Sequence, residues 1–120
     1  MSESKYKDRQ GFEMENWPEL RSKANELTPL VLGGGQIPRR LKFEIFTVAS
    51  QSAGCRHCQS HGAYLLNKTG AGVDRIKALW SYQTSEHFTD AERAAVDLAR
   101  LAGLSPNLSG PENFEELRKH

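Results

Sequence analysis

The chain has 120 residues, 38% of them hydrophobic, and a formal net charge of +1. This length suffices for one compact core and is short for two. The balanced charge and scattered basic residues exclude the electrostatic pattern of proteins that bind nucleic acid or anionic membranes. No apolar run approaches the roughly 20 residues of a membrane span, and residues 1–8 lack signal-peptide character. We therefore expect a soluble, cytoplasmic protein that binds neither nucleic acid nor membrane.

Residues 1–16 are rich in Lys, Glu, Asp and Ser, which predicts a flexible N-terminal arm. Residues 17–120 are expected to form a single helical domain. Pro18 suits a first helical turn, and apolar residues at three- to four-residue spacing continue a first helix to Gly33. The triple glycine that starts there lacks the Lys-Ser/Thr of a phosphate-binding loop and therefore indicates a connector.

The second helix opens at Pro38, runs toward Gly54 and is apolar almost all round. Such a helix is usually central in a fold, which makes Glu44 the exceptional residue within it. A third helix begins at Cys55, where Gly54 interrupts the second one. It continues until a segment typical of a helix C-terminus and turn, which ends at Gly70.

The fourth helix is expected to carry Val73, Ile76, Leu79 and Trp80 on one face. Residues 89–92 form a capping box that starts a fifth helix, which Gly103 stops. Its small residues permit close helix packing. A short last helix would turn Phe114 and Leu117 inward. Because β-branched residues never alternate over more than a few positions, the predicted fold class is all-α, a compact domain of five to six helices.

Residues 55–62 concentrate both cysteines and two of the four histidines. Cys55 and Cys58 share one face at the start of a helix, where the partial positive charge stabilises a thiolate. His61 lies one turn further on the same side and can exchange a proton with the Cys58 sulfur. Glu44 would complete a proton relay. This arrangement suits reduction of a peroxide, because a thiolate attacks the O–O bond and the neighbouring thiol closes a disulfide.

Other interpretations of these residues stay open. The cysteine pair can be structural or incidental, or a slow redox sensor without turnover. Zinc accepts the ligand types of residues 55–61, but on a helix His57 points about 100° away from the cysteine face, so we expect no metal and no cofactor. Glu44 can form an ordinary ion pair with Arg40, four residues earlier. For His57 the alternative is an exposed neighbour of the thiols, or a hydrogen-bond donor, rather than a catalytic base.

Several blocks of residues 37–102 resemble the carboxymuconolactone decarboxylase superfamily, specifically its alkylhydroperoxidase D-like branch. The resemblance rests on residues 38–42, 48–51, 54–61, 75–80 and 88–95, which agree in order. It implies an alkylhydroperoxidase D-like helical fold and a peroxidase activity of the peroxiredoxin type that acts on organic hydroperoxides or hydrogen peroxide. It also implies assembly into homotrimers or homohexamers. Relatives commonly continue with another long helix after a segment like Phe114–His120.

The resemblance also implies roles for single residues. Cys58 would be the attacking thiol, Cys55 the resolving thiol, His61 the relay base and Glu44 its carboxylate, with His57 as an auxiliary residue. In the family pattern the glutamate lies one residue earlier, where this chain has Phe43, and the histidine lies one residue later. The electrostatic argument favours Cys55 as the more reactive thiol because it is nearer the helix start, so the order of attack stays open.

Because the chain has two cysteines, the disulfide needs an external dithiol partner, of a lipoyl- or thioredoxin-like kind, to reduce it. The superfamily offers one enzymatic alternative, a lactone decarboxylase, which has no use for a dithiol. A non-catalytic oligomeric module that senses redox state or binds zinc is the alternative from another class. In every case, a helical domain with an uncovered apolar face is expected to form a homo-oligomer.

Overall fold

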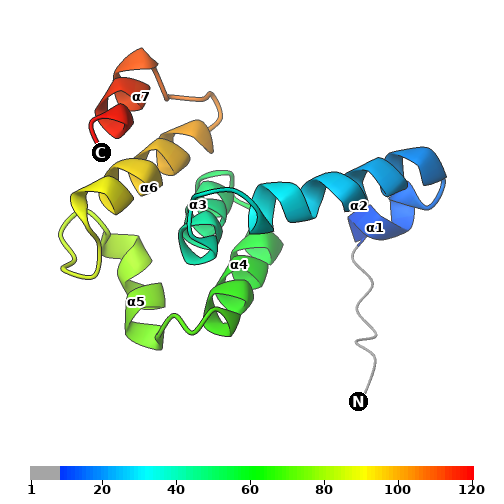
Figure 1. Cartoon of the computed structure of the whole chain (residues 1–120), viewed down its shortest axis with the longest axis horizontal. Coiled ribbons are helices and arrows are strands. Elements are labelled where there is room, and N and C mark those ends of the chain that lie inside the picture. Colours follow the sequence, from blue (N-terminus) through cyan, green and yellow to red (C-terminus); the bar gives the residue numbers. More distant parts are fainter. Residues whose placement is uncertain (1–8) are drawn as a thin grey trace. The chain divides into compact units, whose positions relative to one another are not determined.

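The computed structural model describes residues 9–120, whose regular secondary structure is all helical, as predicted. Contacts within the chain divide it into two units, with the boundary between Gln36 and Ile37. The helices are α1 (Arg9–Met14), α2 (Pro18–Gly33), α3 (Arg39–Ser52), α4 (Arg56–Lys68), α5 (Val73–Ala78), the 3-10 helix η1 (Leu79–Ser81), α6 (Asp90–Ala102) and α7 (Pro111–Arg118) (Figure 1). Within the described part, no helix is long and apolar enough to cross a membrane.

The first unit contains α1 and α2, which contact each other. The predicted arm over residues 1–16 lies partly outside the described residues, but Arg9–Met14 is helical, which an arm is not. Arg21 explains the difference, because its guanidinium on α2 donates hydrogen bonds to the Gly11 carbonyl at 2.5 Å and to Glu15 at 3.4 Å. The boundary between the two units follows Gln36, whereas the sequence analysis placed the start of the helical domain after residue 16.

The first unit ends in the glycine connector that the sequence indicates. Helix α2 stops at Gly33, and Gly34 caps it with a hydrogen bond from its N–H to the Leu30 carbonyl. Gly35 has a φ of 82°, a conformation that side chains with a Cβ rarely adopt. Helix α2 itself buries none of its residues, although its apolar side chains have the spacing of a buried stripe.

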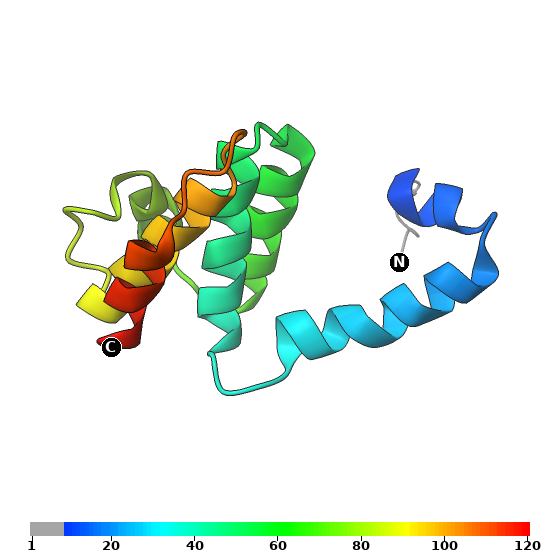
Figure 2. The same ribbon diagram turned by 90° about the horizontal axis from the view of Figure 1, so that it is seen from above.

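The second unit is built around α3, which lies between α4 and α6 (Figures 1 and 2). The nearly all-round apolar character of α3 explains this central position, as predicted, because two faces of the helix are covered at once. Its most buried apolar residues are Phe43 and Val48. The other helices and the segments that connect them complete the core with Leu66, Ala71, Leu79, Tyr82, Phe88, Ala95, Val96 and Ala99.

Small residues let the helices of this core approach closely. Gly62 on α4 faces Thr47 on α3 so closely that a Cβ at Gly62 would lie 3.0 Å from the Thr47 Cβ. The Thr47 hydroxyl donates a hydrogen bond to the Phe43 carbonyl at 2.7 Å, which satisfies its polar group within the buried contact. The spacing of α3 and α4 therefore depends on the absence of a side chain at one position.

The fourth predicted helix is in fact two short ones, since α5 gives way to the 3-10 helix η1 at Leu79. The tighter helix changes the angle between successive side chains. Of the four apolar residues expected on one face, Leu79 is buried and Ile76 half-buried, whereas Val73 and Trp80 are 59% and 50% exposed.

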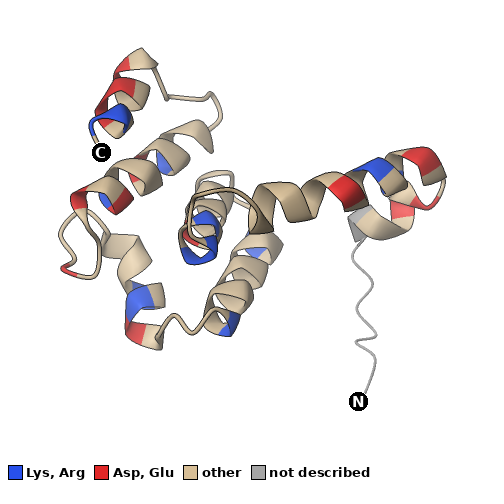
Figure 3. Ribbon diagram, viewed as in Figure 1, with Lys and Arg blue, Asp and Glu red and all other residues tan. Residues whose placement is uncertain are grey.

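Helix α6 begins with the predicted capping box. The Thr89 hydroxyl accepts a hydrogen bond from the Glu92 N–H, and the Glu92 carboxylate accepts one from the Thr89 N–H. The helix ends at Ala102 with Gly103 as its C-cap, also as predicted. Acidic and basic residues occur together on α6 and on α7, so neither helix carries charges of one sign (Figure 3).

Helix α7 packs against α6 and leaves an apolar groove of about 610 Å³ bounded by α3, α6 and α7. Ile45, Ala95 and Phe114 are among the residues that line it. Leu117 is half-buried and Phe114 is 45% exposed. Both residues line this groove, so both face inward as predicted.

Candidate thiol redox site

Cys55 and Cys58 form a disulfide at the N-terminal end of α4, with their Cα atoms 5.3 Å apart. The chain reaches this position through Gly54, whose φ of 75° turns the backbone between α3 and α4. The Cys55 N–H then donates a hydrogen bond to the Ser50 carbonyl at 2.9 Å, so the end of α3 holds the start of α4. Both cysteines are half-buried, which leaves the disulfide accessible from solvent.

Cys55 is the N-cap residue of α4, and its Sγ accepts a hydrogen bond from the Cys58 N–H at 3.2 Å. The first turn of α4 contains no acidic residue. A sulfur anion at this position would therefore gain from the helix dipole and from an N–H donor, with no acidic side chain in the same turn to oppose it. This geometry suits a cysteine pair that exchanges between dithiol and disulfide.

His61 lies on the exposed face of α4, one turn after Cys58. Its ring is stacked between two others on the same helix, with centroid distances of 6.3 Å to His57 and 6.4 Å to Tyr64. The ring of Phe46 on α3 meets His61 edge-on at 6.4 Å. The structure thus brings the rings of His57 and His61 together on α4, the helix that begins after Cys55. Their joint action with the two cysteines stays a prediction.

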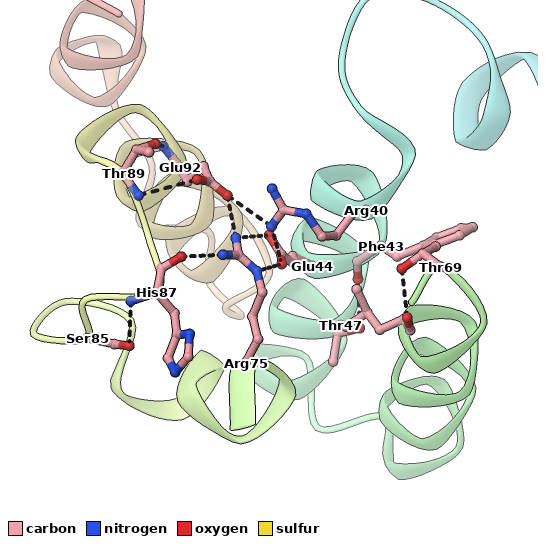
Figure 4. Close-up of polar contacts among 11 residues, drawn as sticks. Arg40, Phe43, Glu44, Thr47, Thr69, Arg75, Ser85, His87, Thr89 and Glu92 are labelled. Carbon is pink, nitrogen blue, oxygen red and sulfur yellow. Dashed lines mark hydrogen bonds and ion pairs between the residues drawn. The ribbon is translucent and has the colours of Figure 1, made fainter. Parts of the chain in front are cut away.

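Glu44, the predicted relay carboxylate, is 1% exposed and lies in an ion-pair network (Figure 4). Its Oε1 accepts hydrogen bonds from Arg40 at 2.8 Å and from Arg75 Nε at 2.7 Å, and its Oε2 accepts one from Arg75 at 3.3 Å. The alternative of an ion pair with Arg40 is therefore confirmed. Within residues 9–120 no hydrogen bond joins Glu44 to His61, and the relay through Glu44 stays a prediction.

Glu92 closes the network from α6. It accepts hydrogen bonds from Arg40 at 3.0 Å and from Arg75 (Figure 4). Burial opposes ionisation of Glu92, but the Thr89 N–H, the Arg40 hydrogen bond and the charges of both arginines outweigh it and lower its pKa. Two carboxylates and two guanidinium groups therefore neutralise one another where α3, α5 and α6 meet.

Arg75 is the residue of this network that the sequence analysis did not single out. Its guanidinium also lies 4.5 Å from the centroid of the Phe88 ring and donates a hydrogen bond to the His87 carbonyl (Figure 4). Burial works against the charge of Arg75, but its bonds and proximity to Glu44 and Glu92 raise its pKa. Only its place in one of the blocks that carry the family resemblance, 75–80, could have drawn attention to it.

Histidine and cysteine side chains are also the residue types that bind zinc. In residues 9–120 no group of three or more His, Cys, Asp or Glu side chains is arranged to hold a metal ion. The disulfide ties up both sulfurs of the pair, and thiolates are the form of cysteine that binds zinc.

No protein-family model and no curated protein matches the sequence. Two solved structures are similar to it, both of the debrominase Bmp8, one of them a cysteine-to-alanine variant in complex with 2,3,4-tribromopyrrole. The variant is 29% identical and the apo protein 30% identical, and both have a TM-score of 0.83 over 91% of this chain. The chain spans 58% and 59% of the length of those proteins.

Proposed function

We propose that this protein is a dithiol-dependent hydroperoxide reductase of the alkylhydroperoxidase D-like branch of the carboxymuconolactone decarboxylase superfamily. The observation that carries the proposal is the Cys55–Cys58 disulfide at the start of α4, one turn from His61. A disulfide in this position is the oxidised product that two-electron reduction of a peroxide leaves. The reaction balances as one hydroperoxide and two thiols giving an alcohol, water and one disulfide.

In this proposal one thiolate attacks the terminal peroxide oxygen, the O–O bond breaks, and an alkoxide leaves. The attacking sulfur becomes a sulfenic acid. The second thiol then attacks this sulfur, its hydroxyl leaves as water, and the disulfide closes. His61 supplies and accepts the protons, since its exposed ring is within a helical turn of Cys58. An external dithiol then reduces the disulfide by exchange.

The two cysteines are not equivalent in the structure. The Cys55 Sγ already accepts the Cys58 N–H and therefore has a donor that would stabilise its thiolate. Cys58 in turn is closer along α4 to His61. We therefore keep both as reacting groups and let experiment decide which one attacks. The exposed apolar groove bounded by α3, α6 and α7 supports our expectation of a homo-oligomer.

A second candidate function is reductive dehalogenation of an aromatic halide. It is supported by the similarity to the debrominase Bmp8 over 91% of this chain. The same two thiols can supply the two electrons, because an aryl bromide and two thiols give the arene, bromide, a proton and one disulfide. The candidates share the cysteine pair and differ in the acceptor, so they can be separated with a single protein preparation.

The test mixes fully reduced protein with one equivalent of tert-butyl hydroperoxide or of 2,3,4-tribromopyrrole and follows free thiols, protein mass and released bromide. A peroxidase loses two thiols and two hydrogens of mass with the peroxide, far faster than free cysteine reacts. Cys58→Ser and Cys55→Ser should each prevent disulfide formation, and the variant that still forms a sulfenic acid identifies the attacking thiol. His61→Ala should slow the reaction.

Thiols that react with the peroxide no faster than free cysteine would overturn the peroxidase proposal. Thiol oxidation with stoichiometric bromide release would then support the dehalogenase instead. If neither acceptor oxidises the pair, both candidates fail, and the sensor and lyase alternatives remain to be tested. Glu116→Gln on the exposed face of α7 serves as a control, because this residue is remote in sequence from the cysteines and pairs with Lys119.

A further inference from the structure

The rings of His57 and His61 form a pair on the exposed face of α4. They are four residues apart, so one helical turn brings them to the same face. Their planes are within 8° of parallel, and their centroids are 6.3 Å apart. Both side chains are exposed. His57 was expected to point away from the cysteines and therefore to bind no metal with them. In the structure its ring lies against that of His61.

This distance is close to what a shared metal ion requires. A metal about 2.1 Å from each ring nitrogen lies about 3.2 Å from each centroid, and a tetrahedral angle then separates the centroids by about 5 Å. The observed separation of 6.3 Å exceeds that value by about 1 Å. Rotation about the side-chain bonds of two exposed histidines can supply this adjustment without moving the helix.

We propose that His57 and His61 chelate a divalent transition-metal ion of the Zn²⁺, Ni²⁺ and Cu²⁺ class. Two histidines at this spacing on one helix face are a recurrent metal-binding element, and imidazole nitrogen selects these ions over Mg²⁺ and Ca²⁺. Water completes the coordination, which agrees with the lack of any three-residue ligand group in the described chain. The site exists in the oxidised protein, because it uses neither sulfur of the disulfide.

Metal binding at this pair would compete with the proposed chemistry at the cysteines. A metal on His61 occupies the nitrogen lone pair that would accept a proton from the adjacent thiol. This consequence rests on the proposed function, whereas the metal site itself does not.

The site is tested by calorimetric titration of the oxidised wild-type protein with ZnCl₂ and with NiCl₂. We expect one ion per chain, and we expect either His57→Gln or His61→Gln to weaken binding about tenfold or more, since each removes one of two protein ligands. His120→Gln is the matched control. His120 Nε2 lies 3.7 Å from Glu116 Oε1, so these two side chains form an alternative pair of metal ligands four residues apart. MgCl₂ should show no binding.

Two results would overturn the proposal. One is Zn²⁺ binding by His57→Gln that equals the wild type, and the other is loss of binding in His120→Gln alone. NMR spectra of the histidine rings provide an independent readout in the unmodified chain, where Zn²⁺ should shift the signals of two of the four imidazoles. The disulfide form cannot reduce peroxide, so failure here and failure of the proposed peroxidase activity are separate outcomes.

Discussion

Arg75 joins α5 to the central helix by donating a hydrogen bond from Nε to the Glu44 carboxylate at 2.7 Å. Glu44 is 1% exposed, so this contact and the one from Arg40 replace the water that its charge would otherwise require. The Arg75–Glu44 pair also links α3 to the loop before α6, because Arg75 donates a second hydrogen bond to the His87 carbonyl in that loop (Figure 4). Glu44 therefore has a clear structural role whatever its part in proton transfer.

We expect Glu44→Gln to lower the free energy of unfolding by about 3 kcal/mol, because Glu92 alone then faces the two part-buried guanidinium charges of Arg40 and Arg75. Urea unfolding measures this change, and unchanged stability would contradict the structural role. The rate at which the reduced pair reacts with peroxide, measured on the folded fraction, tests the predicted relay separately. A large loss of rate would support the relay, whereas a rate close to wild type would leave Glu44 with the structural role alone. Glu116→Gln, which breaks an exposed pair with Lys119, is the control for charge removal.

Glu92 gives the network a pH dependence. Its pKa in the folded protein lies below the ordinary value of 4.5, so the folded state favours the ionised form. The resulting stabilisation is complete above about pH 4.5 and is lost as the pH falls through the lowered pKa. Stability curves of Glu92→Gln should therefore be flatter than wild type on the acid side. Glu86→Gln, an exposed loop residue, should keep the wild-type slope, and an equal acid slope in Glu92→Gln would contradict this account.

Gly62→Ala should lower the free energy of unfolding by about 1 to 3 kcal/mol, because overpacking forces helices apart. The added Cβ would sit 3.0 Å from the Thr47 Cβ and 3.2 Å from its Cα, which belongs to the backbone of α3 and cannot rotate away. Gly72→Ala is a matched control, since nothing lies within 4 Å of a Cβ there. Gly62→Ala should unfold at a clearly lower temperature than Gly72→Ala. Equal melting temperatures would show that α3 and α4 can move apart without loss of stability.

Cys55 is expected to contribute to the stability of α4 as its N-cap. Under reducing conditions Cys55→Ser should be more stable than Cys55→Ala by about 1 kcal/mol, since serine supplies an acceptor for the Cys58 N–H and alanine does not. Chemical unfolding in excess reductant measures the difference, because no disulfide then contributes in either variant. Equal stabilities would mean that the sulfur does not cap the helix in solution.

The parts of the structure that depend on neighbouring residues were predictable from the sequence. The capping box of α6, the stop at Gly103 and the start of α4 at Cys55 each depend on residues within one or two turns. The central position of α3 followed from its composition alone, because an all-round apolar helix has no solvent face. The location of the thiols and His61 on one short segment followed for the same local reason.

The Glu44 network could not be read fully from the sequence because its members are far apart along the chain. The pair with Arg40 could be predicted because Arg40 lies one helical turn before Glu44, whereas Arg75 is 31 residues from Glu44 along the chain. The change from α5 to a 3-10 helix at Leu79 was also not predicted, since the spacing of apolar residues does not distinguish the two kinds of helix over so few residues. The stacking of His57 on His61 needed actual side-chain directions, which helical spacing gives only approximately.

The hydrogen bond from the Cys58 N–H to the Cys55 Sγ makes one backbone amide sensitive to the oxidation state of the pair. The atom that caps α4 is also an atom that gains or loses a bond when the protein is oxidised or reduced. The charge and direction of the acceptor at that amide therefore change whenever the pair is oxidised or reduced. The amide resonance of Cys58 is in this sense an intrinsic spectroscopic reporter, from which the oxidised and reduced fractions of the protein can be counted without any added label.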